Sequence, residues 1–178
     1  YVGWSYIADE LDGRLPVRIR AVPEGSVVPT SNILVSIEST DPKVFWIASW
    51  LETMLLRVWY PINVATTSYF CKQTILDYLE KTADDPAGEI AFKLHDFGAR
   101  GVSSHESAAI GGAAHLLISR GSDTVIAAVW AQYHLNEGRP VASSIPAMEH
   151  ATVLAWPTED AAYRQMMTAF GSGVFAMV

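Results

Sequence analysis

The spacing of hydrophobic and polar residues predicts strands in the first part of the chain. Residues 15–22 alternate apolar and basic side chains, as a half-buried strand does, and residues 33–37 form a second short apolar run. The PEGS segment between them, residues 23–26, consists of turn-forming residues. Residues 1–12, which precede the strands, have the spacing of an amphipathic helix. We therefore predict that residues 1–40 are part of a β-rich N-terminal domain.

The next stretch has helical spacing. Asp41 and Pro42 are typical of a helix N-cap followed by the first helical position. Apolar residues follow at helical intervals, at Trp46, Trp50, Leu51, Met54 and Leu55. Pro61 is expected to end this helix, and a second helix is predicted through residues 74–79.

After residue 90, short apolar runs alternate with amphipathic segments. Strands are predicted at residues 91–95, at 141–145 and at the end of the chain, and helices at 103–118, 125–133, 149–155 and 158–170. Ser103 and Glu106 fit a capping box, and Gly111 and Gly112 inside the helix predict close packing against a strand or a ligand. This alternation predicts the α/β class, with residues 41–178 forming part of an irregular, TIM-like α/β barrel.

The two ends predict that the chain is incomplete. It starts without Met, and residues 173–178 are an apolar run typical of a buried strand, with no turn after it. We therefore expect an internal piece of a longer protein.

Composition narrows the class of protein. Half of the 178 residues are hydrophobic, and 12 Lys and Arg against 19 Asp and Glu give a net charge of −7, which argues weakly against nucleic acid or an anionic membrane as a partner. Cys71 is the only cysteine, so no internal disulfide is expected. The apolar runs are too short for a membrane span, and no signal peptide opens the chain. We expect a globular, cytoplasmic protein.

Residues 95–101 are the first candidate for chemistry. They lie where a predicted strand ends and a helix is about to begin, which is the functional edge of α/β folds. Phe97 beside Arg100 is suited to stacking a planar ring and binding an anion. The alternative is that Phe97 belongs to the core and Arg100 pairs with Asp96, and the pattern alone leaves both open.

Two further loops are candidates. Asp123 follows a strand-like segment, although capping the next helix is the commoner role for such an Asp. Ser144 belongs to the short strand predicted at residues 141–145, and His150 lies in the first turn of a predicted helix. Glu149 and His150 are adjacent, so on a helix they would diverge by about 100°, which argues against a shared metal site. No HExxH, paired CxxC, P-loop, GxGxxG or GxSxG motif is present.

Together these segments resemble the nicotinamide phosphoribosyltransferases in order and spacing. The similarity spans nearly the whole chain, and its most specific part is the HDFG-x-RG-VSS run. Ala99 replaces a Tyr of some relatives, and His105 stands where others have Gln. The matching segments are residues 41–43 (DPK), 58–66 (VWYPINVAT), 93–104 (KLHDFGARGVSS), 121–125 (GSDTV) and 145–150 (IPAMEH).

The resemblance implies an enzyme, a pentosyltransferase of NAD salvage. Members of the family convert nicotinamide and phosphoribosyl pyrophosphate to nicotinamide mononucleotide and pyrophosphate, with Mg²⁺ and with ATP as a coupled activator. They join an α/β barrel catalytic domain to a β-rich domain and form homodimers with shared active sites. The donor phosphate motifs would follow Val178, so the fragment would carry the nicotinamide-binding half of the site and be inactive alone.

The resemblance also implies roles for single residues. Phe97 would stack on one face of the nicotinamide ring, with Arg100 beside the ring and the ribose. Asp123 would accept a hydrogen bond from the carboxamide NH₂. His150 matches the histidine that is phosphorylated when ATP hydrolysis is coupled to the reaction. The remaining pocket residues would be Ser144, Ile145 and, at the edge, His95.

Three other functions compete with this one. A nicotinate phosphoribosyltransferase is disfavoured by Asp123, because a carboxylate repels nicotinate and accepts from an amide. A non-catalytic binding or scaffold fragment would be recognised from the sequence that follows. A metal-dependent barrel hydrolase using His95, Asp96 and His150 lacks the spacing of metal ligands.

Overall fold

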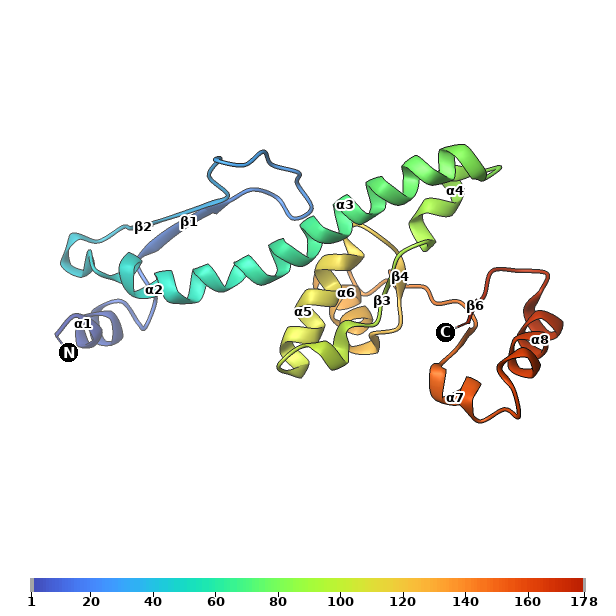
Figure 1. Cartoon of the computed structure of the whole chain (residues 1–178). Coiled ribbons are helices and arrows are strands. Elements are labelled where there is room, and N and C mark those ends of the chain that lie inside the picture. Colours follow the sequence, from blue (N-terminus) through green and yellow to red (C-terminus); the bar gives the residue numbers. More distant parts are fainter. Residues whose placement is uncertain (1, 178) are drawn as a thin grey trace. The chain divides into compact units, whose positions relative to one another are not determined.

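The computed structural model describes residues 2–177 and divides into two compact units, residues 1–63 and 64–178 (Figure 1). Each unit is described by itself. The predicted division into a β-rich part over residues 1–40 and a barrel part over residues 41–178 refers to domains of a longer protein and stays a prediction.

The first unit contains the predicted hairpin. Helix α1 (Val2–Glu10) precedes strands β1 (Val17–Ala21) and β2 (Val35–Ser39), which pair antiparallel. The basic residues of β1 lie on one face, where the guanidinium groups of Arg18 and Arg20 both contact the Glu38 carboxylate, at 2.8 and 3.2 Å. The pKa of Glu38 is therefore lowered, first by the hydrogen bond from Arg18.

The core of this unit forms around the start of the predicted helix. Asp41 accepts a 2.9 Å hydrogen bond from the Lys43 N–H and caps the short helix η1 (Pro42–Val44), as the sequence predicts. Tyr6 donates to the other carboxylate oxygen at 2.7 Å, and these two bonds lower the pKa of Asp41. Helix α2 (Ile47–Leu55) follows. The buried residues are Ile7, Val44, Ile47 and Leu51.

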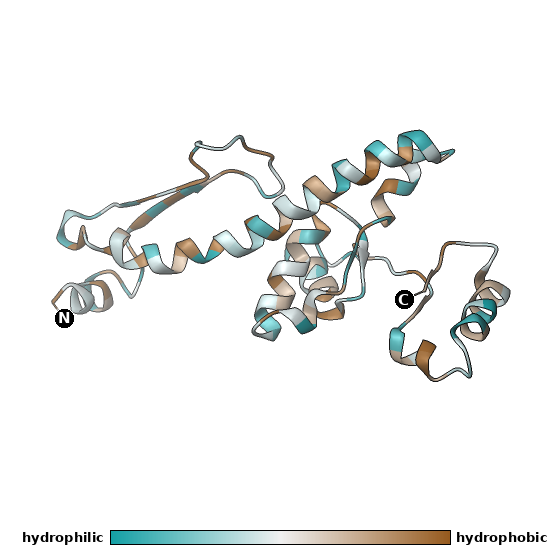
Figure 2. Cartoon of the chain, viewed as in Figure 1, coloured by the Kyte–Doolittle hydropathy of each residue, from teal (hydrophilic) through white to brown (hydrophobic). Residues whose placement is uncertain are grey.

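The prediction that Pro61 separates two helices is wrong. After η2 (Leu56–Val58), helix α3 (Trp59–Thr82) runs through 24 residues, and Pro61 is its third residue. The first four N–H groups of a helix have no intrahelical partner, so a proline there costs no hydrogen bond. Apolar and polar residues are mixed along α3 (Figure 2), and none of the described helices is long and apolar enough to cross a membrane.

The second unit contains the segments with candidate chemistry. Helices α4 (Pro86–Glu89) and η3 (Ile90–Phe92) lead into strand β3 (His95–Asp96) and η4 (Gly98–Gly101). Helix α5 (His105–Leu116), strand β4 (Gly121–Ser122) and helix α6 (Val125–Leu135) follow, and β3 and β4 are parallel. The strands predicted at 91–95 and 141–145 shrink to two residues and to one parallel bridge between Gly121 and Ser143. The α5 cap is Ser104, which accepts from the Ser107 N–H, rather than the predicted Ser103.

The last segments build a smaller core. Strand β5 (Ala147–Met148) leads into helices α7 (His150–Leu154) and α8 (Glu159–Phe170), and β5 pairs parallel with β6 (Ala176–Met177). Their buried residues are Met148, Val153, Ala162 and Met166. Residues 2–177 therefore have a mixed α/β structure with three two-stranded sheets and no closed barrel, so the α/β class is supported and the TIM-like barrel is not confirmed.

Gly112 of α5 is explained by close packing. A Cβ atom on Gly112 would collide with the Cβ of Ala127 on α6 and lie 2.5 Å from Oδ2 of Asp96. Only glycine therefore allows α5 to pack against both α6 and the strand that precedes Phe97, as the sequence predicts.

We expect Gly112→Ala to destabilise the protein by about 1–3 kcal/mol, because the added methyl group forces a shift of packed backbone. Urea unfolding would measure the loss. Gly101→Ala is the matched control, since nothing lies within 4 Å of a Cβ at that position. Equal stability of the two variants would contradict this account of the α5–α6 contact.

Candidate active site

Three parallel segments end at one edge of the second unit. Strand β3 pairs with β4, and Gly121 of β4 bridges to Ser143 on its other side. The residues that follow these segments are Phe97, Asp123 and Ser144, and Ser144 donates a hydrogen bond to Oδ1 of Asp123. The pairing agrees with the prediction that these segments end at one edge of parallel strands, and convergence of the three side chains on one pocket stays a prediction.

Phe97 is not a core residue. Its side chain is 59% exposed, and its ring stacks against His95 with centroids 6.1 Å apart and an interplanar angle of 23°. The Asp96 carboxylate accepts a 2.7 Å hydrogen bond from the Gly98 N–H, and among residues 2–177 no ion pair joins it to Arg100. The alternative of a core Phe97 with an Asp96–Arg100 pair is therefore wrong, and Arg100 is exposed at the end of η4.

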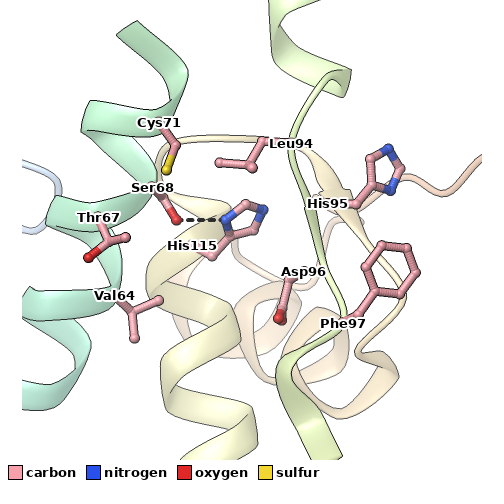
Figure 3. Close-up of a pocket in the computed structure, with 9 residues that line it drawn as sticks. All are labelled: Val64, Thr67, Ser68, Cys71, Leu94, His95, Asp96, Phe97 and His115. Atoms are coloured by element: carbon pink, nitrogen blue, oxygen red, sulfur yellow. Dashed lines mark hydrogen bonds between the residues drawn. The ribbon is translucent and has the colours of Figure 1, made fainter. Parts of the chain in front are cut away.

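The side chains along β3 alternate between two sides of the strand. Figure 3 shows the rings of His95 and Phe97 on one side, and Leu94 and Asp96 on the side toward His115. This is the two-residue periodicity of extended backbone. It separates an outward aromatic pair from an inward set that holds the strand in place.

Asp123 does not cap the next helix. The N-cap of α6 is Thr124, and no side chain makes the cap hydrogen bond. The Asp123 side chain is 33% exposed, with Oδ1 accepting from Ser144 and Oδ2 lying 3.8 Å from Nδ1 of His95. The commoner structural role is thereby excluded, and the carboxylate is available to a ligand at the strand edge.

The Nε2 atom of His95 holds the imidazole ring in place. Nε2 lies 3.0 Å from the carbonyl oxygen of Phe92, and the side chain is only 11% exposed. Nδ1 is buried and has no hydrogen-bond partner among the described residues. The ring thus lies between Phe97 and Asp123 and contacts both candidate residues.

A buried hydrogen-bond chain supports the strand that precedes Asp123. His115 on α5 is 4% exposed, with Nε2 2.9 Å from the Gly121 carbonyl and Nδ1 2.8 Å from the Ser68 hydroxyl of α3. The carbonyl can only accept, so Nε2 donates to it, and in the neutral tautomer with hydrogen on Nε2 the Nδ1 atom accepts from Ser68. Sequence analysis missed this pair. The available signal was a histidine within the small, apolar run of α5.

We expect Ser68→Ala to leave the buried Nδ1 of His115 without a donor and to cost about 1–3 kcal/mol of stability. Thermal or urea unfolding would measure the change. Thr66→Ala, at an exposed position of the same helix, is the matched control. A Ser68→Ala protein as stable as this control would mean that water replaces the hydroxyl.

A pocket of about 210 Å³ lies behind the strand edge, between α3, β3 and α5 (Figure 3). Its wall includes Ser68, Cys71, His115, the β3 residues His95 and Asp96, and Phe97, but not Asp123 or Ser144. The cavity therefore lies next to the strand edge that carries Phe97 and Asp123.

His150 lies in a different local setting. It is the first residue of α7, its side chain is 60% exposed, and Nδ1 lies 2.8 Å from Oε1 of Glu149. Glu149 is the N-cap, with extended backbone, and its carboxylate also accepts from the Ala151 N–H. The expectation that the two side chains diverge is therefore wrong, because Glu149 precedes the helical turn. Among the described residues, no hydrogen bond or ion pair joins His150 to Asp123.

Potential metal ligands are not clustered in the described part of the chain. Among residues 2–177, no three His, Cys, Asp or Glu side chains are grouped closely enough to hold a metal ion.

The predicted site residue Ile145 is half-buried, and its carbonyl oxygen lies 3.3 Å from the Ser144 hydroxyl, so Ile145 borders the edge that carries Ser144 and Asp123.

The sequence of this chain is similar to proteins of a known family. Residues 92–177, which contain β3, η4 and the Asp123 and His150 loops, match the nicotinate phosphoribosyltransferase (NAPRTase) family. A nicotinamide phosphoribosyltransferase of Xanthomonas campestris pv. campestris (strain 8004) is 58% identical over 171 residues, which cover 94% of this chain and 36% of that protein.

Two more distant relatives are also named nicotinamide phosphoribosyltransferase. Nicotinamide phosphoribosyltransferases of Acinetobacter baylyi and Mycoplasma pneumoniae are 29% and 33% identical, over 93% and 79% of this chain and 34% and 29% of their own lengths. The chain thus spans about a third of the length of the curated relatives it matches. A family match over residues 92–177 and a 58% identical relative over nearly the whole chain show that this chain is similar to part of the enzymes of the nicotinate phosphoribosyltransferase family.

Proposed function

We propose that the protein containing this chain transfers a phosphoribosyl group from phosphoribosyl pyrophosphate to nicotinamide, giving nicotinamide mononucleotide and pyrophosphate. One observation carries the proposal. The exposed aromatic ring of Phe97 and the carboxylate of Asp123, which does not cap a helix, follow adjacent parallel strands and lie at the same edge. The names of the relatives support the same reaction.

The two side chains suit the two parts of nicotinamide. The face of Phe97 offers stacking to a planar pyridine ring, and the acceptor-only carboxylate of Asp123 suits an amide NH₂. Ser144 holds one carboxylate oxygen of Asp123, and Ile145 would border the ring. Arg100, exposed one 3₁₀ turn after Phe97, would lie beside the ring and the ribose.

The chemistry needs positioning more than a strong base. Departure of pyrophosphate builds positive charge on the ribose, as in other glycosyl transfers, and the ring nitrogen of nicotinamide is already a nucleophile. Holding that nitrogen at the anomeric carbon supplies most of what the base half of such a site contributes. Mg²⁺ would accompany the donor phosphates, and among residues 2–177 no three His, Cys, Asp or Glu side chains are grouped to hold a metal ion.

His150 is proposed as the histidine that ATP phosphorylates. It is exposed at the first residue of α7, where the helix terminus favours negative charge. A phosphate there would add about −1.5 to −2 charges, while Glu149 would have to release the ring. The protein is further proposed to act as a homodimer in the cytoplasm, with active sites shared between subunits.

We expect the full-length protein to incorporate label from ATP at His150. The His150→Ala variant should lose this label, and His134→Ala, an exposed histidine on α6, should keep it. Acid-labile phosphate on tryptic peptides is the measurement. Unchanged labelling of His150→Ala would assign the phosphorylation to another residue.

The main rival is transfer to nicotinate, and Asp123 disfavours it because two carboxylates repel. A binding or scaffold protein without catalysis is the second rival. One assay separates the three: full-length protein is incubated with phosphoribosyl pyrophosphate, Mg²⁺ and either base, and the mononucleotide products are quantified. Formation of nicotinamide mononucleotide supports the proposal. Nicotinate mononucleotide as the faster product, or no product from either base, would refute it.

A further inference from the structure

We propose that His95 positions Asp123 for base selection by donating a hydrogen bond from Nδ1 to Oδ2 of that carboxylate, while Nε2 donates to the Phe92 carbonyl. The inference rests on the proposed function, since it assigns to His95 the orientation of the Asp123 carboxylate, which would accept a hydrogen bond from the nicotinamide carboxamide. In this arrangement the ring carries a hydrogen on both nitrogens.

The first step concerns Nε2. It lies 3.0 Å from the carbonyl oxygen of Phe92. A backbone carbonyl can only accept, so a hydrogen bond at this distance requires a hydrogen on Nε2. One of the two ring nitrogens is therefore committed to donating into the backbone before β3 begins.

The second step concerns Nδ1. This atom is buried, has no partner among the described residues and lies 3.8 Å from Oδ2 of Asp123. Without a hydrogen, its lone pair would be an unsatisfied buried acceptor facing a carboxylate, which is unfavourable on both counts. With a hydrogen, Nδ1 faces Oδ2 of Asp123 at ion-pair distance and can form a charge-assisted contact with it.

The third step concerns what the pair does for Asp123. Ser144 already donates to Oδ1, so a second donor on Oδ2 would fix both oxygens and stop rotation of the carboxylate. His95 also stacks on Phe97, so one ring sets the relation between the stacking surface and the hydrogen-bond acceptor. The carboxylate still has no hydrogen to offer nicotinate.

Nitrogen-15 NMR of the full-length protein at neutral pH tests the hydrogen-bond pattern directly, without reference to activity. The His95 ring, assigned with His95→Gln, should show two protonated nitrogens in the wild type, and Asp123→Asn should return it to one. Exposed His134 is the internal control and should be the same in both proteins. A bare Nδ1 in the wild type, or a His95 signal that Asp123→Asn leaves unchanged, would overturn the proposal.

Steady-state kinetics test the consequence for the base. Gln at position 95 places its amide N–H near the position of Nε2 and keeps the bond to Phe92, whereas Asn places its N–H near Nδ1 and keeps the bond to Asp123. His95→Gln should raise the KM for nicotinamide on the order of tenfold with kcat little changed, and His95→Asn should restore most of the loss. In an Asp123→Asn background, the two substitutions at position 95 should become equivalent.

The kinetic outcomes separate a positioning role from a structural one. If Asn is as harmful as Gln, or if Gln is harmless, His95 supports only the backbone at Phe92 and the proposal is refuted. Failure of the proposed function looks different: the wild type would form no nicotinamide mononucleotide, whatever the NMR signal. That result would also remove the role in base selection assigned to the pair.

Discussion

Asp123→Asn in the full-length enzyme is expected to shift the preference between nicotinamide and nicotinate by about ten- to a hundredfold. The carboxylate accepts from an amide NH₂ and cannot donate to the carboxylate of nicotinate. Asn removes the negative charge and supplies an NH₂ that can donate. The variant should therefore lose activity on nicotinamide and gain relative activity on nicotinate.

The size of the shift follows from two effects of the same sign. A hydrogen bond from a neutral donor to a charged acceptor is worth about 1.5–3 kcal/mol, or roughly ten- to a hundredfold in an equilibrium constant. Repulsion between two carboxylates opposes nicotinate in the wild type, but Asp123 is a third exposed, so solvent weakens this repulsion. The hydrogen-bond difference should therefore dominate.

The measurement is the ratio of kcat/KM for the two bases, because this ratio reports differential binding of the two transition states. Glu137→Gln removes a carboxylate whose side chain is 87% exposed and is the matched control for loss of charge. If both variants leave the ratio unchanged, Asp123 does not read the amide, and the base preference has another source.

The strand edge was predictable from the sequence because it depends on local order. Phe97, Asp123 and Ser144 each follow a short apolar run, and parallel strands bring such positions to one edge. The fold class follows from the same alternation. The roles of these residues come from the family resemblance and stay predictions, since geometry alone does not identify a ligand.

The wrong predictions have local causes. Pro61 is compatible with α3 because it lies in the first turn, which the sequence could show only if the start at Trp59 were known. Residues 90–96 form the 3₁₀ helix η3 and the two-residue strand β3, because the carbonyl groups of Ala91 and Leu94 accept hydrogen bonds from Ser119 and Arg120 instead of forming a full strand ladder. The sequence of the predicted strand gives no signal of these hydrogen bonds to Ser119 and Arg120.

The supporting residues were hidden for a related reason. Ser68 and His115 are 47 positions apart, and each is ordinary in its own segment. Only the packing of α3 against α5 joins them, and only the fold shows that their chain of hydrogen bonds ends on Gly121, two residues before Asp123. Long-range polar pairs of this kind have no periodicity, so a pattern-based analysis finds strand ends more readily than the residues that hold them.

The second large effect is expected from Phe97→Ala, which should lower kcat/KM for nicotinamide by about ten- to a hundredfold with little loss of stability. Stacking between an aromatic side chain and a heterocyclic base is worth about 1–3 kcal/mol by alanine substitution. The ring is 59% exposed, so folding buries little of it and its removal leaves no core cavity.

Two further variants make the Phe97 result specific. Phe70→Ala removes a ring that is 63% exposed on α3 and controls for loss of surface aromatic area. Phe97→Tyr keeps a stacking face and should retain most of the activity. Both bases contain the pyridine ring, so Phe97→Ala should weaken nicotinamide and nicotinate alike, whereas Asp123→Asn changes their ratio. A Phe97→Ala protein with wild-type kcat/KM, or one that unfolds far more easily, would place the ring in a structural contact and move the base site elsewhere.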